Sequence, residues 1–208
     1  MKAFVVTGTD TDVGKTVVSA MLTLALDGLY WKPIQCGTDD GTDTKTVSAL
    51  SGRAHKEAYV LRAPLSPHRA AEVENRTIDW NALDLPRDVP ENTTLIVEGA
   101  GGLMVPITRD ILQIELFARW HAPVILVART ALGTINHSLL SLEALRLWRI
   151  KVHGIVFVGD EMPDSESTIV DMGGVKHLGR LPRLPALNEG ALRQAFADHF
   201  KLSDFALG

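Results

Sequence analysis

Residues 7–16 carry the side chains whose chemistry is easiest to recognise. They read Thr-Gly-Thr-Asp-Thr-Asp-Val-Gly-Lys-Thr and lie between an apolar run at 3–6 and a helix-like pattern at 17–26. A strand, a glycine-rich turn and a helix start in this order form a cradle for phosphate groups. Gly14 lets backbone N–H groups approach phosphate oxygens, Lys15 can reach the β- and γ-phosphates, and the Thr16 hydroxyl can bind Mg²⁺. We predict a nucleotide-binding loop (P-loop); the alternative is a turn that contains Gly-Lys-Thr by chance.

This loop departs from the usual pattern in its spacing and charge. Five residues separate Gly8 from Gly14, whereas the common loop has four intervening positions. Asp10 and Asp12 lie inside the loop, where a site for phosphate alone would avoid negative charge. They indicate a cationic ligand or a metal nearby, unless they only face solvent or cap backbone N–H groups.

Further polar residues follow the apolar runs at 29–34 and 94–97. Lys32 would place a second cation beside Lys15, so that two cations surround a transferring phosphoryl group, unless it is a surface lysine on an edge strand. Asp43 can bind Mg²⁺ as a hard oxygen ligand, or it can cap a helix like its neighbour Thr42. Glu98 ends an apolar strand, where P-loop proteins place a carboxylate near Mg²⁺, and burial there is costly without a partner.

A second helix start follows the apolar run at 124–128. It reads Ala-Leu-Gly-Thr-Ile-Asn-His at 131–137, and a helix N-terminus is suited to a carboxylate. Asn136 and His137 can contact a ligand there, or they can be ordinary residues of a first helical turn.

Apolar, β-rich runs alternate with helical patterns along the chain. Strands are expected at 3–7, 29–34, 94–98, 124–128, 152–158 and 177–181, and helices at 15–27, 42–50, 66–74, 111–120, 134–148 and 189–200. This alternation predicts an α/β fold with a mostly parallel sheet covered by helices on both faces. Ligands of such sheets bind at the carboxyl ends of the strands, which is where the polar residues described above occur.

Length, charge and cysteine content exclude several classes of protein. The 208 residues suit one domain, the net charge is −4, and there is a single cysteine, Cys36. We find no basic run typical of nucleic-acid binding, no apolar stretch long enough to span a membrane and no signal-peptide pattern. A disulfide framework within the chain is excluded, and we expect a cytoplasmic protein.

Four motifs in order give a family resemblance. GTDTDVGKT, KPIQCG, EGAGGLMVP and LGTINHSLLSLEAL together resemble the dethiobiotin synthetases of the biotin pathway, up to about residue 157. The resemblance implies a single P-loop domain over 1–208 and a homodimer with Mg²⁺. It also implies an ATP-dependent ligase that joins CO₂ to 7,8-diaminononanoate and closes the ureido ring of dethiobiotin, releasing ADP and phosphate.

The resemblance also assigns roles residue by residue. It implies that Lys15 and Lys32 are catalytic, that Thr16, Asp43 and Glu98 bind the metal, and that Asp12 lies near the diamine. The nucleotide site it implies comprises Asp12, Val13, Gly14, Lys15, Thr16, Val17, Glu98, Gly99, Ala100, Gly101, Pro182, Arg183 and Leu184. The substrate site it implies comprises Asp12, Cys36, Gly133, Thr134, Ile135 and Asn136, with residues 133–136 supplied by the partner subunit to hold the substrate carboxylate.

Two segments depart from the family pattern. Cys36 replaces a small hydroxyl residue, and a thiol is a weaker hydrogen-bond donor. Val158 and Gly159 stand where the family often presents an Asn-Asp pair to adenine, so base selectivity for ATP is in question. Residues 103–106 are apolar and can line a groove for the substrate's alkyl spacer or belong to the core.

Two other functions are alternatives for a chain with a P-loop. A partition or positioning ATPase shares the P-loop fold, but it would be expected to carry a basic patch or a basic amphipathic tail for DNA or membrane. The tail at 191–205 has few positive charges and instead predicts a helix packed on the core. A glutamine-dependent synthetase would need a glutaminase half, for which the chain is too short.

Overall fold

The structure is a computed structural model that describes residues 2–206. Its strands are β1 (Lys2–Gly8), β2 (Leu29–Trp31), β3 (Ile34–Cys36), β4 (Tyr59–Leu61), β5 (Thr94–Gly102), β6 (Val124–Arg129), β7 (Val152–Val158) and β8 (His177–Leu181). Its helices are α1 (Lys15–Ala25), α2 (Asp43–Ser51), α3 (Pro67–Val73), α4 (Gln113–Trp120), α5 (Thr134–Leu147), α6 (Pro163–Gly173) and α7 (Glu189–His199), with 3₁₀ turns at Trp80–Leu83 and Leu202–Phe205.

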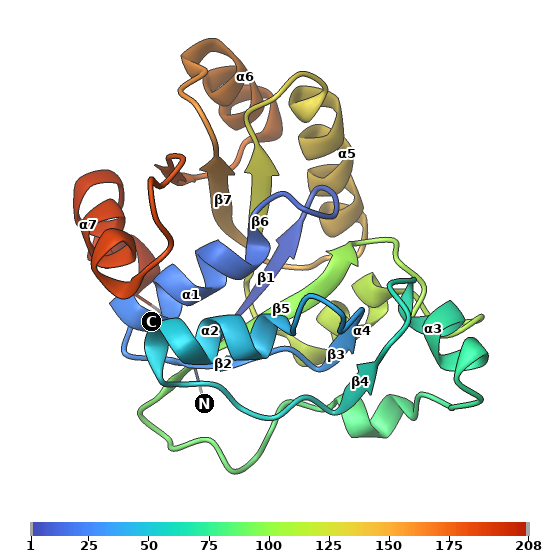
Figure 1. Cartoon of the computed structure of the whole chain (residues 1–208). Coiled ribbons are helices and arrows are strands. Elements are labelled where there is room, and N and C mark those ends of the chain that lie inside the picture. Colours follow the sequence, from blue (N-terminus) through green and yellow to red (C-terminus); the bar gives the residue numbers. More distant parts are fainter. Residues whose placement is uncertain (1, 207–208) are drawn as a thin grey trace.

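Six parallel strands form the central sheet, in the order β2-β5-β1-β6-β7-β8. β1 lies between β5 and β6 in the middle of the sheet (Figure 1). After β1 the chain first extends the sheet on one side and later continues on the other side with β6, so the strand order reverses beside β1. Ligands of open α/β sheets bind at such a point, and this topology confirms the predicted fold class.

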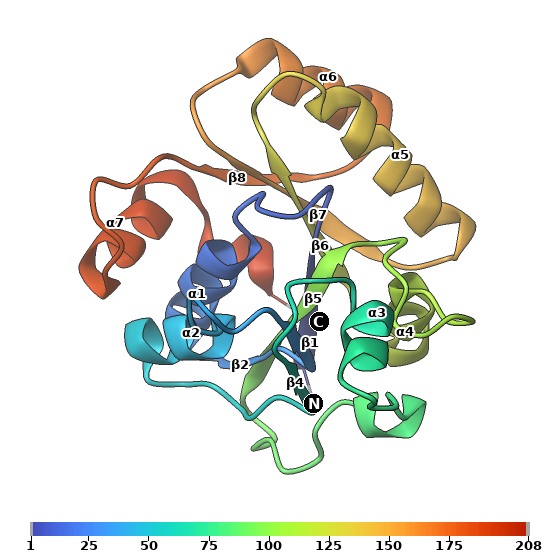
Figure 2. The same cartoon turned by 45° about the vertical axis from the view of Figure 1, so that its right-hand side comes forward.

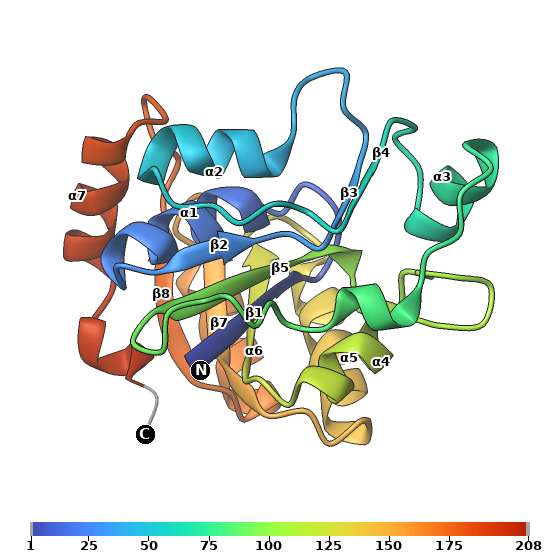
Figure 3. The ribbon, with the colours of Figure 1, turned by 90° about the horizontal axis from the view of Figure 1, so that it is seen from below.

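Helices cover both faces of the sheet, as its apolar strands require. Figure 3 shows α1, α2 and α7 on one face and α4, α5 and α6 on the other. Side chains of β1 alternate between the two layers: Phe4 and Val6 pack in the core of the α1 face, and Val5 packs in the core of the α4 face. The turned view in Figure 2 shows α5 and α6 side by side, and these helices are in contact. Their Leu142 and Ile169 share a third core cluster over β6 and β7.

The prediction of one strand over 29–34 is wrong. The chain forms β2 up to Trp31 and then a separate strand, β3, from Ile34, which pairs in parallel with β4 as a second, two-stranded sheet. Pro33 lies at the break, and proline has no N–H to donate to a continuing ladder. The break places Lys32 between the two sheets, at the carboxyl end of β2.

One helix, α6, was not predicted. Its sequence is polar, but Pro163 stands in its first turn together with Asp164 and Glu166, and these residue types favour a helix start. The other helices were predicted within four residues of their observed ends. None of the helices in the described range is long and apolar enough to cross a membrane.

Candidate active site

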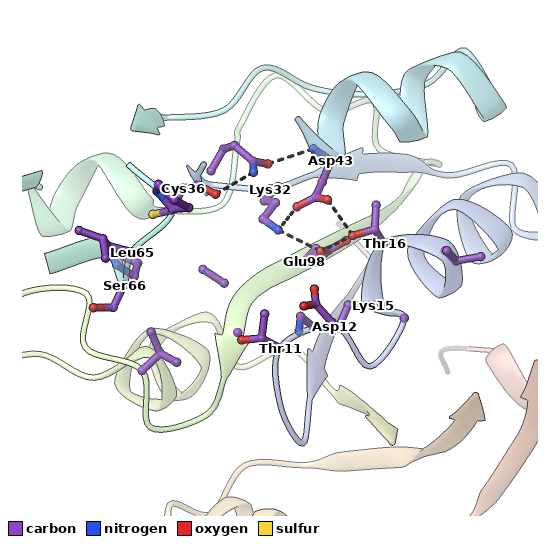
Figure 4. A pocket seen from close by; sticks show the side chains of 18 residues that line it. Thr11, Asp12, Lys15, Thr16, Lys32, Cys36, Asp43, Leu65, Ser66 and Glu98 are labelled. Atoms are coloured by element: carbon purple, nitrogen blue, oxygen red, sulfur yellow. Dashed lines mark hydrogen bonds and ion pairs between the residues drawn. The ribbon is translucent and has the colours of Figure 1, made fainter. Parts of the chain in front are cut away.

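A cavity of about 810 Å³ opens at the carboxyl ends of β1, β2 and β5, beside the start of α1 (Figure 4). Its lining includes eleven of the predicted site residues: Asp12, Gly14, Lys15, Thr16, Val17, Lys32, Cys36, Asp43, Glu98, Ala100 and Gly101. The remaining lining residues are Thr11, Gln35, Pro64, Leu65, Ser66, Pro67 and Val105. The cavity thus brings together residues from five separate segments of the chain, at 11–17, 32–36, 43, 64–67 and 98–105.

The P-loop connects β1 to α1 in a tight turn. Gly14 has φ +97°, and a Cβ there would lie 3.0 Å from Cγ1 of Val158, so a side chain would be both strained and crowded. Lys15 is buried, and its Nζ donates to the backbone oxygen of Asp10 at 2.8 Å. Burial lowers the pKa of Lys15, while the nearby Glu98 carboxylate partly opposes that shift.

The two acidic residues of the loop behave differently. Asp10 is exposed, and its Oδ1 accepts from the backbone N–H of Thr11 at 2.7 Å, which is the backbone-capping alternative. Asp12 lies in the left-handed region with φ 56° and lines the cavity. Asp12 therefore faces the larger cavity, whereas Asp10 lines a smaller cavity between the P-loop, residues 102–105 and α5.

Lys32 lies at the centre of a charged cluster between the two sheets. Its Nζ donates to Glu98 Oε1 at 3.0 Å and also to Asp43 Oδ2, as Figure 4 shows. Thr16 Oγ1 lies 3.0 Å from Asp43 Oδ1 and 3.0 Å from Glu98 Oε1. Burial lowers the pKa of Lys32, but Glu98 and Asp43 outweigh burial and raise it overall. Lys32 is thus a buried cation rather than a surface lysine.

The oxygens of this cluster suit a divalent cation. Mg²⁺ is usually held by one or two carboxylates, with waters and substrate phosphates completing the shell. Asp43 and Glu98 supply two carboxylates that converge on the Thr16 hydroxyl, so the donor set fits Mg²⁺. Within residues 2–206 no group of three or more His, Cys, Asp or Glu is arranged to hold a metal, so phosphate oxygens would have to complete this site.

Asp43 is positioned by its neighbours on both sides. Thr42 is the N-cap of α2, and its Oγ1 accepts from the N–H of Lys45 at 3.2 Å. The N–H of Asp43 donates to Gln35 Oε1 at 3.0 Å. Thr42 therefore performs the capping role, and the carboxylate of Asp43 is left to point at Lys32 and Thr16.

The glycine-rich end of β5 is held by α4. Gln113 is buried, accepts from the Ala100 N–H at 2.6 Å and donates to the Gly102 carbonyl at 2.9 Å. A Cβ on Gly99 would lie 2.8 Å from Phe117 and 2.9 Å from Gln113. Gly99 thus permits close packing of α4, while Ala100 and Gly101 face the cavity.

Cys36 lies at the far end of the cavity from the P-loop, beside Leu65 and Ser66 (Figure 4). Burial raises the pKa of its thiol to about 11, partly opposed by Lys32. The side chain is therefore a neutral thiol at physiological pH and acts as a small apolar group with weak hydrogen-bonding capacity.

Val158 and Gly159, which are predicted to lie beside the adenine base, form backbone hydrogen bonds within the chain. The carbonyl of Val158 accepts from the Thr130 N–H at 3.1 Å, and the N–H of Gly159 donates to the Leu181 carbonyl at 3.0 Å. Arg180 donates to the Gly159 carbonyl at 3.2 Å. Each of these three groups therefore already has a hydrogen-bond partner within the chain.

The loop at 182–184 lies outside the cavity lining. Arg183 pairs with Asp160 at 3.3 Å, and both side chains are exposed. Leu184 packs against the core of the α1 face. The role of Pro182, Arg183 and Leu184 at the base therefore stays a prediction.

A second cavity of about 300 Å³ lies between the P-loop, residues 102–105 and α5. Leu103, Met104 and Val105 line it, together with Leu140 and Ser141 of α5. The helix start at 133–136 lines neither cavity of its own chain.

Comparison with known proteins identifies the family to which this chain is related. The family model for an AAA domain matches residues 2–191. An ATP-dependent dethiobiotin synthetase BioD of Nitrobacter hamburgensis is 57% identical over 98% of this chain and 97% of that relative. The enzyme of the same name from Agrobacterium fabrum is 54% identical over 97% of this chain and 96% of its own length. The chain belongs to the ATP-dependent dethiobiotin synthetase family. Membership confirms the predicted resemblance and the predicted class of enzyme, a ligase.

Solved structures at low identity confirm the fold alone. The cell division ATPase MinD of Pyrococcus furiosus has a TM-score of 0.54 and 16% identity, over 92% of this chain and 88% of that chain. A MinC:MinD cell division complex from Aquifex aeolicus gives 0.53 and 15%, over 94% and 86%. These two cell division proteins thus share the fold of this chain, and at this identity nothing of their function carries over.

Sequence reasoning missed several residues of the site. Gln35 lies inside the KPIQCG motif, but its contact with Asp43 is visible only in three dimensions. Tyr30 is fully buried, and its hydroxyl donates to Glu98 Oε2 at 3.0 Å. A signal did exist for Tyr30: it precedes Lys32 by two positions, and residues two apart on a strand lie on the same face.

Proposed function

We propose that this member of the dethiobiotin synthetase family uses ATP and Mg²⁺ to join CO₂ to 7,8-diaminononanoate and to close the ureido ring. The observation that carries the proposal is the convergence of Lys15, Lys32, Thr16, Asp43 and Glu98 on one cavity. Two buried lysines beside a carboxylate–hydroxyl cluster match the charge that develops on a transferring phosphoryl group. Family membership supports the choice of substrate.

The reaction needs no protein nucleophile. One amine of the substrate, uncharged, attacks CO₂ and loses a proton to give a carbamate. A carbamate oxygen then attacks the γ-phosphorus and ADP departs, leaving a carbamic–phosphoric anhydride. The second amine attacks the carbamoyl carbon, phosphate leaves with the C–O bond electrons, and loss of the amine proton completes the cyclic urea.

The chain's own residues position the reactants and stabilise charge in these steps. Lys15 would leave its contact with the Asp10 carbonyl and neutralise the β- and γ-phosphates, and Lys32 would face the other side of the transferring group. Asp12 suits the amine end of the substrate. Mg²⁺, bound by Thr16, Asp43 and Glu98, would neutralise charge on the phosphate oxygens.

The direct test follows ATP hydrolysis with and without the diamine and bicarbonate. A synthetase should release ADP only when both are present, with one dethiobiotin formed for each ADP. A switch ATPase would hydrolyse ATP at the same rate with and without the diamine. Such an outcome would contradict the proposed function and favour the partition-type alternative.

We also propose that two copies of the chain share each substrate site. Leu140 and Leu147 on α5 are 62% and 81% exposed, although apolar surface of this kind is usually covered in a stable assembly. The second cavity is open beside this surface, and a partner's helix start at 133–136 could complete it. A helix N-terminus suits the substrate carboxylate, and the apolar residues 103–105 suit its alkyl spacer.

A mixing experiment tests the shared site. Chains with Lys15→Ala and chains with Asn136→Trp should each be inactive as pure dimers. Mixed dimers should recover activity, because one of their two sites would contain neither substitution. No recovery in demonstrated mixed dimers would mean that each subunit holds a complete site.

A further inference from the structure

The tyrosine behind the charged cluster has no role in the chemistry described so far. Tyr30 is fully buried in β2, and its hydroxyl donates to Glu98 Oε2 at 3.0 Å. Its neighbour Trp31 packs in the core of the opposite face, so Tyr30 and Lys32 project from the same side of the strand. Both therefore meet Glu98, Tyr30 from the core and Lys32 from the cavity.

The two oxygens of Glu98 have different partners. Oε1 accepts from Thr16 Oγ1 and from Lys32 Nζ, each at 3.0 Å. Oε2 accepts from the Tyr30 hydroxyl. Glu98 is only 1% exposed, so solvent does not readily replace a donor that is removed. A buried acceptor without a partner is unfavourable, and the terminal torsion of a glutamate side chain is broad. Without the hydroxyl, the carboxylate would rotate to find other donors.

We infer that Tyr30 is a positioning residue: its hydroxyl holds Glu98 Oε2 in the core so that Oε1 is presented to Thr16, Lys32 and the cation. This inference rests on the proposed cation site. Partners that orient metal ligands contribute to metal affinity, and their removal weakens it about 10- to 100-fold. A tyrosine that only fills the core would not affect the cation.

The chain offers a matched control for this contact. It contains two tyrosines, Tyr30 and Tyr59. The hydroxyl of Tyr59 accepts from the Asp79 N–H at 2.8 Å, and Tyr59 is not among the residues that line the cavity. Tyr59→Phe therefore removes the same atom from a site unrelated to Glu98.

The experiment measures Mn²⁺ binding by electron paramagnetic resonance in the presence of a non-hydrolysable ATP analogue. Tyr30→Phe should weaken Mn²⁺ binding about tenfold or more, whereas Tyr59→Phe should stay within about twofold, as substitutions away from a site do. Thermal unfolding of each variant is followed in parallel. A lower melting temperature for Tyr30→Phe with unchanged Mn²⁺ affinity would show a core-filling role and overturn the inference.

A second measurement does not need a Tyr30 variant that folds. In the Tyr59→Phe chain labelled with 3-fluorotyrosine, Tyr30 is the single ¹⁹F reporter. Its resonance should move when Mg²⁺ is added to the complex with the ATP analogue, and Glu98→Gln should abolish that response. An unmoved resonance would overturn the inference.

If the unsubstituted protein with the ATP analogue binds no Mn²⁺, the proposed cation site is wrong and the inference falls with it. Tight Mn²⁺ binding by both the unsubstituted and Tyr30→Phe proteins would refute the inference alone.

Discussion

Removal of Lys32 gives a sharp test of the active-site geometry. The ammonium group contacts both carboxylates of the cluster, and the side chains of Lys32, Asp43 and Glu98 are 8%, 29% and 0% exposed. Lys32→Ala would leave two facing carboxylates with no cation between them. Breaking a buried ion pair costs about 3–5 kcal/mol, and the partial exposure of Asp43 places the expected loss of unfolding free energy near the lower end, about 3 kcal/mol. Turnover should fall about a hundredfold, the scale for one preorganised electrostatic group.

Two assays separate stability from catalysis. Urea unfolding without Mg²⁺ measures the loss of stability, and dethiobiotin formation at saturating ATP, Mg²⁺ and diamine measures kcat. Lys32→Met serves as a control because it keeps most of the side-chain volume and removes only the charge. Asp43→Asn should cost less stability in the Lys32→Met background than in the unsubstituted protein, with a coupling of about 0.5–3 kcal/mol, as for residues in direct contact.

Particular results would refute this reasoning. If Lys32→Met folds and its kcat falls less than about threefold, under 1 kcal/mol of barrier, Lys32 does not stabilise charge in the transition state. If the double-mutant cycle shows no coupling, the contact with Asp43 contributes nothing to the folded protein.

Three further predictions follow from the same site. Asp43→Asn should raise the Mg²⁺ concentration for half-maximal rate about tenfold or more, whereas the exposed Asp40→Asn should not; an unchanged titration in both would argue against the cation site. Because the pKa of Cys36 is raised to about 11, its alkylation by iodoacetamide at pH 8 should be about a hundredfold slower than that of a free thiol and should accelerate with pH up to that value. Fast alkylation at pH 8 would show that the thiol is not shielded as the structure has it. If Val158 lies beside the base, as the family resemblance predicts, GTP, CTP and UTP should support the reaction within about tenfold of ATP in kcat/KM, because apolar pockets discriminate weakly. Competition among the four nucleotides checks this, and a preference of about a thousandfold for ATP would reveal hydrogen bonds to adenine.

Much of the site was predictable because its residues follow strands. The P-loop and Lys32 follow strands of a parallel sheet, and the carboxyl ends of such strands meet at one edge. Glu98 was expected to end its strand, but β5 continues to Gly102, and Glu98 lies within it opposite Val6 of β1. For Asp43, the sequence left a metal role and a helix cap as alternatives. The structure resolves the cap in favour of Thr42, because the extended backbone of that residue lets its hydroxyl reach the N–H of Lys45.

The residues that were missed have hydrogen-bond partners in other secondary-structure elements. Tyr30 meets Glu98 across 68 positions, and Gln113 meets Ala100 from the start of another helix. No local pattern predicts which polar side chain satisfies a given buried group. The break at Pro33 was a different failure: an apolar run looked like one strand, and the missing N–H of proline was not weighed against it.

The position of Lys32, the cation beside the P-loop lysine Lys15, helps to distinguish a synthetase from a switch ATPase with the same fold. Lys32 belongs to the same chain as the P-loop and is pinned by Glu98 on a buried strand and by Asp43 at a capped helix start. Charge stabilisation that is already in place costs little reorganisation when the phosphoryl group moves. A switch instead depends on segments that become ordered by the γ-phosphate and relax on its loss. In this chain Gln35 accepts a hydrogen bond from the Asp43 N–H and Tyr30 donates one to Glu98, so both carboxylates around Lys32 are positioned by the chain itself. Such preorganisation favours repeated chemistry over a change of conformation.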